Sequence, residues 1–154
     1  MTPEEKLASL GIELPDPPAP LGSYQPAATS GNLVFLSGML PLKDGKLMRT
    51  GKLGEAISAE EGAGLARQAA INALGVLKAQ VGSLKRVRGC IRVCGYIASA
   101  PDFTAQPSVL NGASDLMAEV FGEAGRHARA AVGVNVLPLD SPVEVEFVFE
   151  VDTD

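Results

Sequence analysis

The clearest periodicity in the chain is a strict alternation of apolar and polar side chains near its C-terminus. Over residues 143–151 every odd position holds Val or Phe, and the even positions hold Glu, Glu, Val and Glu. Because successive side chains of a strand point to opposite faces, this alternation predicts a strand whose odd face lies in the core. In residues 129–137 the larger apolar side chains fall on even positions, which predicts a second strand with Val132, Val134 and Val136 in the core.

Two other segments have the spacing of amphipathic helices. Ser58 and Glu61 form a capping-box pattern, and the helix that they start is closed by Gly82. The apolar stripe of this helix is rich in Ala, which indicates close packing on a sheet. A second helix is predicted to start at residues 101–102 and to end around residues 122–125.

Thr2 and Glu5 repeat the capping-box pattern ahead of a short N-terminal helix, and four prolines in residues 13–20 then predict an extended linker. We therefore divide the chain into a helix and linker, residues 1–21, and one domain, residues 22–154.

The middle of the domain supplies the remaining strands. Two strands flank a turn at residues 30–32, a polar loop with a short strand covers residues 42–54, and a further strand covers residues 87–99. The order is therefore two strands, a helix, a strand, a helix and two strands. This order predicts an α+β fold with the helices on one face of the sheet.

The composition argues against several classes of function. The 13 basic and 18 acidic residues give a net charge of −5, which argues against nucleic acid as the main partner. No segment approaches the roughly 18 apolar residues of a membrane helix, and the start of the chain lacks a signal-peptide core, so we expect a cytoplasmic protein without membrane association. One His and two Cys make a poor metal set, and Cys90 and Cys94 are expected to be reduced thiols.

Arg129 and Glu144, from the last two predicted strands, are candidates for a shared site. By parity, Arg129 and Glu144 both point away from the helices, and Ala131 and Gly133 leave room beside the guanidinium. If the two strands pair as a hairpin, Glu144 lies about 20 Å along the strand from the position opposite Arg129. The two residues can then share a site only across a subunit boundary. The alternative is a cross-strand ion pair between Arg129 and Glu150.

Four short motifs occur in order along the chain. They are Tyr24 two residues after Gly22, Ser37-Gly38 followed by Leu40-Pro41, Asn111 after Asp102-Phe103, and Ala128-Arg129 with Val143-Glu144-Val145 fifteen residues further on. Over residues 22–151 this pattern resembles the reactive-intermediate deaminase (Rid, or YjgF-like) family. The resemblance implies a chorismate-mutase-like fold with a mixed sheet, two long helices on one face and a homotrimeric barrel with sites in the clefts between subunits.

Deaminating members of that family hydrolyse small 2-imino and 2-enamino acids to 2-keto acids and ammonia. The resemblance gives Arg129 the role of holding the carboxylate of a small ligand, which suits a planar guanidinium, and Glu144 the role of holding a water. It places along the same cleft Tyr24, Ser37, Asn111 and the backbone near Ala131. Positioning and one ordered water are sufficient for a reactive imine, so the resemblance implies no metal and no cofactor.

Two positions beside Arg129 depart from the family pattern. His127 stands where proline is usual, and Ala131 stands where Cys or Thr is common. His127 is either a surface residue at the start of the strand or a cleft residue that alters specificity. These changes keep open a second function, the binding or sensing of a small carboxylate without turnover. The endoribonuclease activity attached to the family name is less favoured, because an acidic chain with one His offers no evident acid–base pair.

Overall fold

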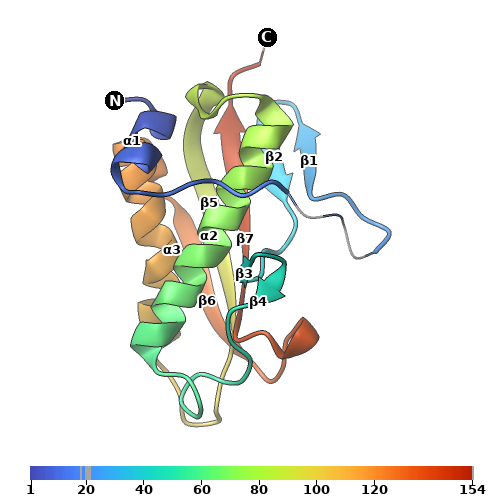
Figure 1. The fold of residues 1–154 in the computed structure, drawn as a ribbon, viewed down its shortest axis with the longest axis vertical. Coiled ribbons are helices and arrows are strands. Elements are labelled where there is room, and N and C mark those ends of the chain that lie inside the picture. Colours follow the sequence, from blue (N-terminus) through green and yellow to red (C-terminus); the bar gives the residue numbers. More distant parts are fainter. Residues whose placement is uncertain (18, 20–21, 154) are drawn as a thin grey trace.

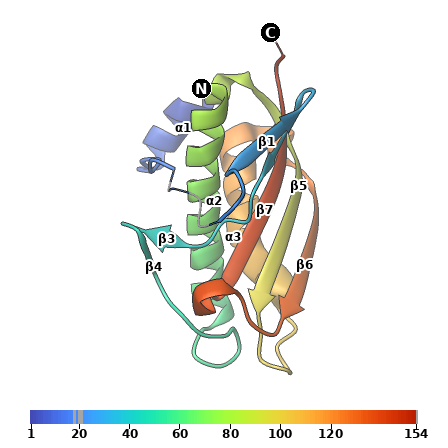
Figure 2. The same cartoon turned by 90° about the vertical axis from the view of Figure 1, so that its right-hand side faces the viewer.

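The computed structural model describes residues 1–17, 19 and 22–153, and its centre is a mixed five-stranded sheet covered on one face by two long helices (Figure 1, Figure 2). The helices α2 (Ala59–Val81) and α3 (Gln106–Phe121) pack side by side. Across the sheet the strand order is β1-β2-β7-β5-β6. These strands are β1 (Ala27–Ser30), β2 (Leu33–Leu36), β5 (Val87–Ala98), β6 (Ala128–Val134) and β7 (Val143–Val151). The predicted α+β arrangement, with both helices on one face, is confirmed.

Helix α2 forms as predicted. The Ser58 hydroxyl accepts a hydrogen bond from the Glu61 amide, the Glu61 carboxylate accepts one from the Ser58 amide, and Gly82 closes the helix with φ +88°. Its predicted apolar stripe is buried against the sheet: Ala66, Ala70, Ala73, Leu74, Leu77 and Val81.

The predicted start of the second helix is wrong by several residues. Residues 101–105 form a turn and a loop, in which the Phe103 amide donates to the Ala100 carbonyl (3.0 Å). Helix α3 begins at Gln106, so that Pro107 occupies its first turn, where a missing N–H leaves no helical hydrogen bond unmade.

The odd face of β7 lies in the core, as its alternation predicts. All five side chains of that face are at most 5% exposed: Val143, Val145, Phe147, Phe149 and Val151. The Phe149 ring packs edge-on against Phe121 of α3, with centroids 6.2 Å apart. This row of side chains therefore anchors the sheet to the helices.

Strand β6 differs from the prediction in both its partner and its orientation. It pairs in parallel with β5, which separates it from β7, so the predicted hairpin between the last two strands does not form. The physical reason is that α3 is the crossover of a β-α-β unit, which places β6 beside β5 and parallel to it. The register sets Arg129 opposite Val93, which faces the core, while Val132 is 42% exposed on the other face.

Strand β5 contains register shifts that change which side chains reach the core. One shift lies between Cys90 and Arg92, so that Cys90 is buried opposite Phe149 and Ile91 is 44% exposed. Cys94 lies opposite Glu146, on the other face from Cys90, and both thiols are free. Burial raises the pKa of the Cys90 thiol to about 12, which keeps it protonated and unreactive.

The N-terminal helix α1 (Pro3–Ser9) has the predicted capping box of Thr2 and Glu5. It packs on the body of the protein, because Leu7 belongs to the core. The Glu4 carboxylate accepts hydrogen bonds from the Leu84 amide (2.7 Å) and the Ser83 hydroxyl (3.0 Å). In Figure 1 the segment after α1 runs across α2.

Short elements complete the chain. The turn between β1 and β2 contains Gly31, whose φ of +61° favours glycine. A separate two-stranded ribbon and three short 3-10 helices make up the rest: β3 (Leu42–Lys43), β4 (Lys46–Leu47), η1 (Leu84–Arg86), η2 (Gly122–Gly125) and η3 (Pro138–Asp140).

Candidate active site

Arg129 lies near the start of β6, on the face that α3 covers. Its Nη1 donates a hydrogen bond to the Ser114 hydroxyl (3.0 Å), and its Nη2 donates one to the Pro107 carbonyl (3.3 Å). The prediction that Arg129 points away from the helices is therefore wrong. The alternative ion pair with Glu150 does not form either, because β5 lies between β6 and β7 and the two strands are not neighbours.

His127 belongs to the same cluster of side chains. It precedes Arg129 by two residues and is half-buried, and its Nε2 lies 2.8 Å from the Ser114 hydroxyl. Its Nδ1 lies 2.6 Å from the Gly125 carbonyl oxygen. His127 is therefore not an isolated surface side chain, and its role as a cleft residue that alters specificity stays a prediction.

Ser114 connects His127 to Arg129, and this residue was not among the predicted site residues. A signal for it exists, because Pro107, Asn111 and Ser114 follow one another at positions i, i+4 and i+7 of α3 and thus share one face of the helix. The Pro107 carbonyl and the Ser114 hydroxyl both contact Arg129. The exposed Asn111 therefore lies on the side of α3 that faces the arginine.

The space beside Ala131 is filled, contrary to the prediction. Ala131 lies opposite Gly95 and packs against the core, and a Cβ on Gly95 would stand 2.6 Å from a Leu110 methyl. Gly133 is similarly close to Gln106. The edge of the sheet remains as the open approach to Arg129, because β6 is the last strand.

Glu144 lies at the start of β7, opposite Tyr96, on the face of the sheet without helices. Burial raises the pKa of its carboxyl, and the negative charge of Glu146 raises it further. The carboxyl packs against Gly38, where a Cβ would stand 2.8 Å from the Glu144 Cδ. Two backbone hydrogen bonds between Met39 and Val145 (2.7 and 3.0 Å) hold this loop along β7.

Ser37 comes directly before Gly38 and so lies in the loop that borders Glu144. Its hydroxyl donates to the Gln25 carbonyl (2.6 Å) and its amide donates to the Pro26 carbonyl (2.9 Å). These bonds connect Ser37 to the segment that carries Tyr24, whose side chain is 52% exposed. The structure thus divides the predicted site residues into two groups, one around Arg129 and one around Glu144.

The two groups lie on opposite faces of the sheet. Arg129 is opposite Val93 and Glu144 is opposite Tyr96, with β5 between their strands. From strand spacing and the three-residue offset, their Cα atoms are about 14 Å apart. The two side chains therefore cannot contact one ligand within a single chain, which is the predicted conclusion reached from a different geometry.

A polar centre lies in the middle of the face that carries Glu144. The Tyr96 hydroxyl donates to Glu146 (2.7 Å), and its hydrogen bonds with Cys94 and Glu146 raise its pKa. A depression of about 230 Å³ beside it is lined by Phe35, Leu36, Arg92, Cys94, Glu146, Phe147 and Val148. Around this centre Phe35 and Val132 are 45% and 42% exposed.

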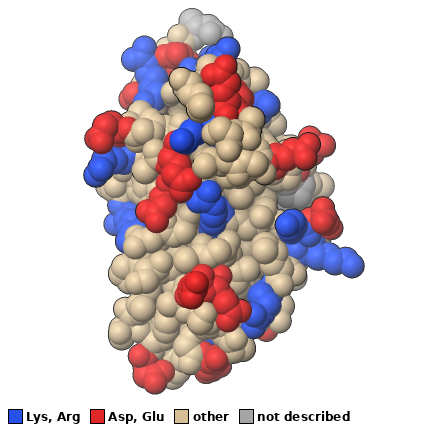
Figure 3. All heavy atoms as spheres, turned by 60° about the vertical axis from the view of Figure 1, so that its left-hand side comes forward, with Lys and Arg blue, Asp and Glu red and all other residues tan. Residues whose placement is uncertain are grey.

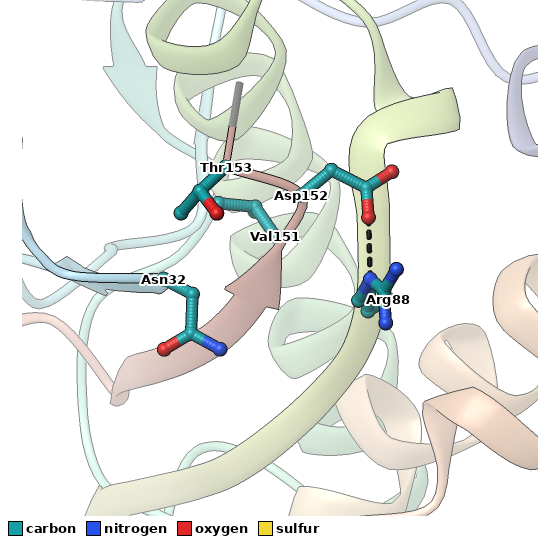
Figure 4. Close-up of a pocket in the computed structure, with 5 residues that line it drawn as sticks. All are labelled: Asn32, Arg88, Val151, Asp152 and Thr153. Atoms are coloured by element: carbon teal, nitrogen blue, oxygen red, sulfur yellow. Dashed lines mark hydrogen bonds and ion pairs between the residues drawn. The ribbon is translucent and has the colours of Figure 1, made fainter.

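A second depression, of about 270 Å³, lies at the C-terminal end of β7 (Figure 4). It is lined by Asn32, Arg88, Val151, Asp152 and Thr153. Arg88 points at Asp152 and forms an ion pair with it, so its charge is already compensated. None of the predicted site residues lines this depression.

Two further classes of site are not supported in the described part of the chain. Within residues 1–17, 19 and 22–153, no three His, Cys, Asp or Glu side chains are grouped so that they could hold a metal ion. Over the same residues, no helix has both the length and the apolar character needed to cross a membrane.

The fold and the order of its motifs define the class of protein. The family model described as "YjgF/chorismate_mutase-like, putative endoribonuclease" matches residues 4–151, and the chain belongs to this family. It is 42% identical to Protein TCP17 of Trypanosoma cruzi over 147 residues, which cover 95% of this chain and 92% of the relative.

The chain is also similar to a protein of known structure and to a protein named as a deaminase. The crystal structure of the protein Atu1372, of unknown function, from Agrobacterium tumefaciens superposes with a TM-score of 0.92 at 41% identity, covering 97% of this chain and 92% of that one. The 2-iminobutanoate/2-iminopropanoate deaminase of Dermatophagoides farinae is 30% identical over 92% of this chain and 95% of its own length.

Proposed function

We propose that the protein hydrolyses small 2-imino or 2-enamino acids to 2-keto acids and ammonia, without a metal or a cofactor. The observation that carries this proposal is an arginine fixed on the edge of the sheet by two groups of α3. A guanidinium has five N–H donors, and these two contacts leave others for the carboxylate of a ligand. The deaminase from Dermatophagoides farinae supports the reaction class.

Glu144 supplies the chemistry in this proposal. A carboxylate with a raised pKa is a better proton acceptor, so it can hold a water and take its proton. The oxygen adds to the imine carbon and the proton passes to the nitrogen, which gives a carbinolamine. The hydroxyl proton of the carbinolamine then passes to the amine nitrogen, the C–N bond breaks as ammonia leaves with its electron pair, and the C–O bond becomes the carbonyl of the keto acid.

The proposed site is completed between copies of the chain, because Arg129 and Glu144 lie on opposite faces of the sheet. We propose a homotrimer in which the faces that carry Glu144 form the inner barrel. The exposed apolar side chains Phe35 and Val132 support burial of this face. The two free cysteines support a reducing, cytoplasmic location.

The experiment is an assay of 2-iminopropanoate, generated by a serine dehydratase, in the presence of the purified protein. We expect faster loss of the imine with the native chain and little acceleration with Arg129→Ala or Glu144→Gln. Arg126→Ala is the matched control, since Arg126 is 76% exposed and pairs only with Glu123 in the described structure. Equal rates with and without the native protein would refute the proposal.

A second candidate is the binding of a small carboxylate without turnover. The observation that favours it is the cluster of His127 and Ser114 beside Arg129, a polar environment different from the one that the family pattern implies. Saturable binding of pyruvate, without any effect on imine hydrolysis, would support this alternative.

Ribonuclease activity is a weaker candidate. On the helix-covered side seen in Figure 3, acidic and basic side chains are intermixed, without a broad basic patch. RNA that stays intact with a clean preparation would dismiss this activity.

A further inference from the structure

The hydrogen bond between the only histidine of the chain and the Gly125 carbonyl has a definite direction. A carbonyl oxygen can only accept, so the contact of 2.6 Å with Gly125 requires the proton on Nδ1 of His127. In the neutral ring Nε2 then carries a lone pair, to which the Ser114 hydroxyl, 2.8 Å away, can donate. With its proton used, the Ser114 oxygen accepts from Nη1 of Arg129.

This direction gives Ser114 and His127 a function. We propose that they are positioning residues, which hold the guanidinium of Arg129 in the orientation that binds the carboxylate of the ligand. The proposal deepens the proposed function and rests on it for the identity of Arg129 as the carboxylate anchor. It adds two residues that the family resemblance does not supply.

We call the hydrogen-bonded series of His127, Ser114 and Arg129 the relay. The geometry explains why it is needed at this place. Arg129 lies on the edge strand β6, with a long side chain that has many rotamers. Ser114 fixes Nη1, and the Pro107 carbonyl, from the same face of α3, fixes Nη2. His127 in turn keeps the Ser114 hydroxyl from turning its proton toward the arginine, so that an oxygen lone pair faces the positive charge.

The first test needs no ligand. Because the chain has one histidine, labelling with ¹⁵N-histidine gives one imidazole in the NMR spectrum. We expect a neutral ring with the proton on Nδ1. Rotation of the Arg129 guanidinium should be slow in the native chain and in Ser114→Thr, which keeps the hydroxyl, and fast in Ser114→Ala. Ser108→Ala, an exposed position in the first turn of α3, is the control and should leave the rotation slow.

The second test measures the ligand. Loss of one hydrogen bond to a charged group corresponds to a roughly tenfold change in affinity. We therefore expect the Kd for pyruvate and the KM for 2-iminopropanoate to rise about tenfold in Ser114→Ala, with kcat unchanged, and to recover in Ser114→Thr. His127→Gln should raise both constants in the same direction.

The outcomes separate the two proposals. A proton on Nε2, a doubly protonated ring, or native guanidinium rotation in Ser114→Ala would overturn the role of Ser114 and His127. Unchanged pyruvate binding in Ser114→Ala would also overturn it. If the native chain shows the relay and slow rotation but neither binds pyruvate nor hydrolyses the imine, the proposed function fails and the ligand role of the relay fails with it, while the relay itself stands.

Discussion

A close backbone contact between the two helices allows a quantitative prediction. A Cβ on Gly112 of α3 would stand 1.8 Å from the Ala63 carbonyl oxygen of α2, and that oxygen belongs to a helix backbone that cannot rotate away. Gly112→Ala therefore forces α3 away from α2 and loosens the packing between them. Overpacking of this kind costs about 3 kcal/mol, and the better helix propensity of Ala returns about 1 kcal/mol. We expect a net loss of about 2 kcal/mol.

The assay is urea denaturation at one fixed protein concentration, followed by circular dichroism. For a chain of this size the loss corresponds to a fall in Tm of roughly 4–8 °C. The matched control is Gly64→Ala in α2, where a Cβ would meet nothing within 4 Å. This change should stabilise the protein by up to about 1 kcal/mol. If Gly112→Ala is as stable as Gly64→Ala, the close contact of α2 with α3 is not as described.

Three further predictions concern the proposed site. When Arg129→Ala and Glu144→Gln chains are co-refolded in equal amounts, about a quarter of the inter-subunit sites should regain both residues by random mixing, and activity should reappear; no recovery would place both residues in one chain's site. In Gly38→Ala the new Cβ would stand 2.8 Å from the Glu144 Cδ and should displace that carboxyl, so kcat should fall while the urea midpoint stays close to the native value. Gly64→Ala, whose Cβ meets nothing within 4 Å, is the control and should leave kcat unchanged. Since the raised pKa of Glu144 means that the folded state binds its proton more tightly than the unfolded state, its charged form destabilises the fold above that pKa. Urea midpoints between pH 4 and 8 should show Glu144→Gln more stable than the native chain at neutral pH, with the difference shrinking as the pH falls toward the ordinary value of 4.5; a constant difference would contradict this.

Local signals predicted the elements whose form depends on neighbours in sequence. The capping box of Ser58 and Glu61 and the closing Gly82 set the bounds of α2 without reference to any other part of the fold. The alternation along β7 identified its buried face, because apolar side chains there alternate with glutamates. The start of α3 was misplaced because its N-cap residue, Ala105, makes no side-chain hydrogen bond and leaves no mark in the sequence.

The candidate site was predicted less completely because its contacts are tertiary. Arg129 and Glu144 stay predictions as site residues, and the residues that contact them come from distant segments. Ser114 is fifteen residues from Arg129 in the chain, and Gly38 is more than a hundred residues from Glu144. Their proximity follows from the packing of α3 on β6 and of the loop at residues 37–39 on β7.

The error on β6 shows why size alternation is a poor guide on an edge strand. Along this strand valines alternate with Ala131 and Gly133, so both faces are apolar and hydrophobicity does not distinguish them. The small residues face α3 because the helix packs closely there, with Leu110 beside Gly95 and Gln106 beside Gly133. The larger Val132 therefore remains on the open face, where it is half-exposed in a single chain. Val132 is thus an exposed apolar side chain on the face opposite Arg129, which supports our proposal that another subunit covers this face.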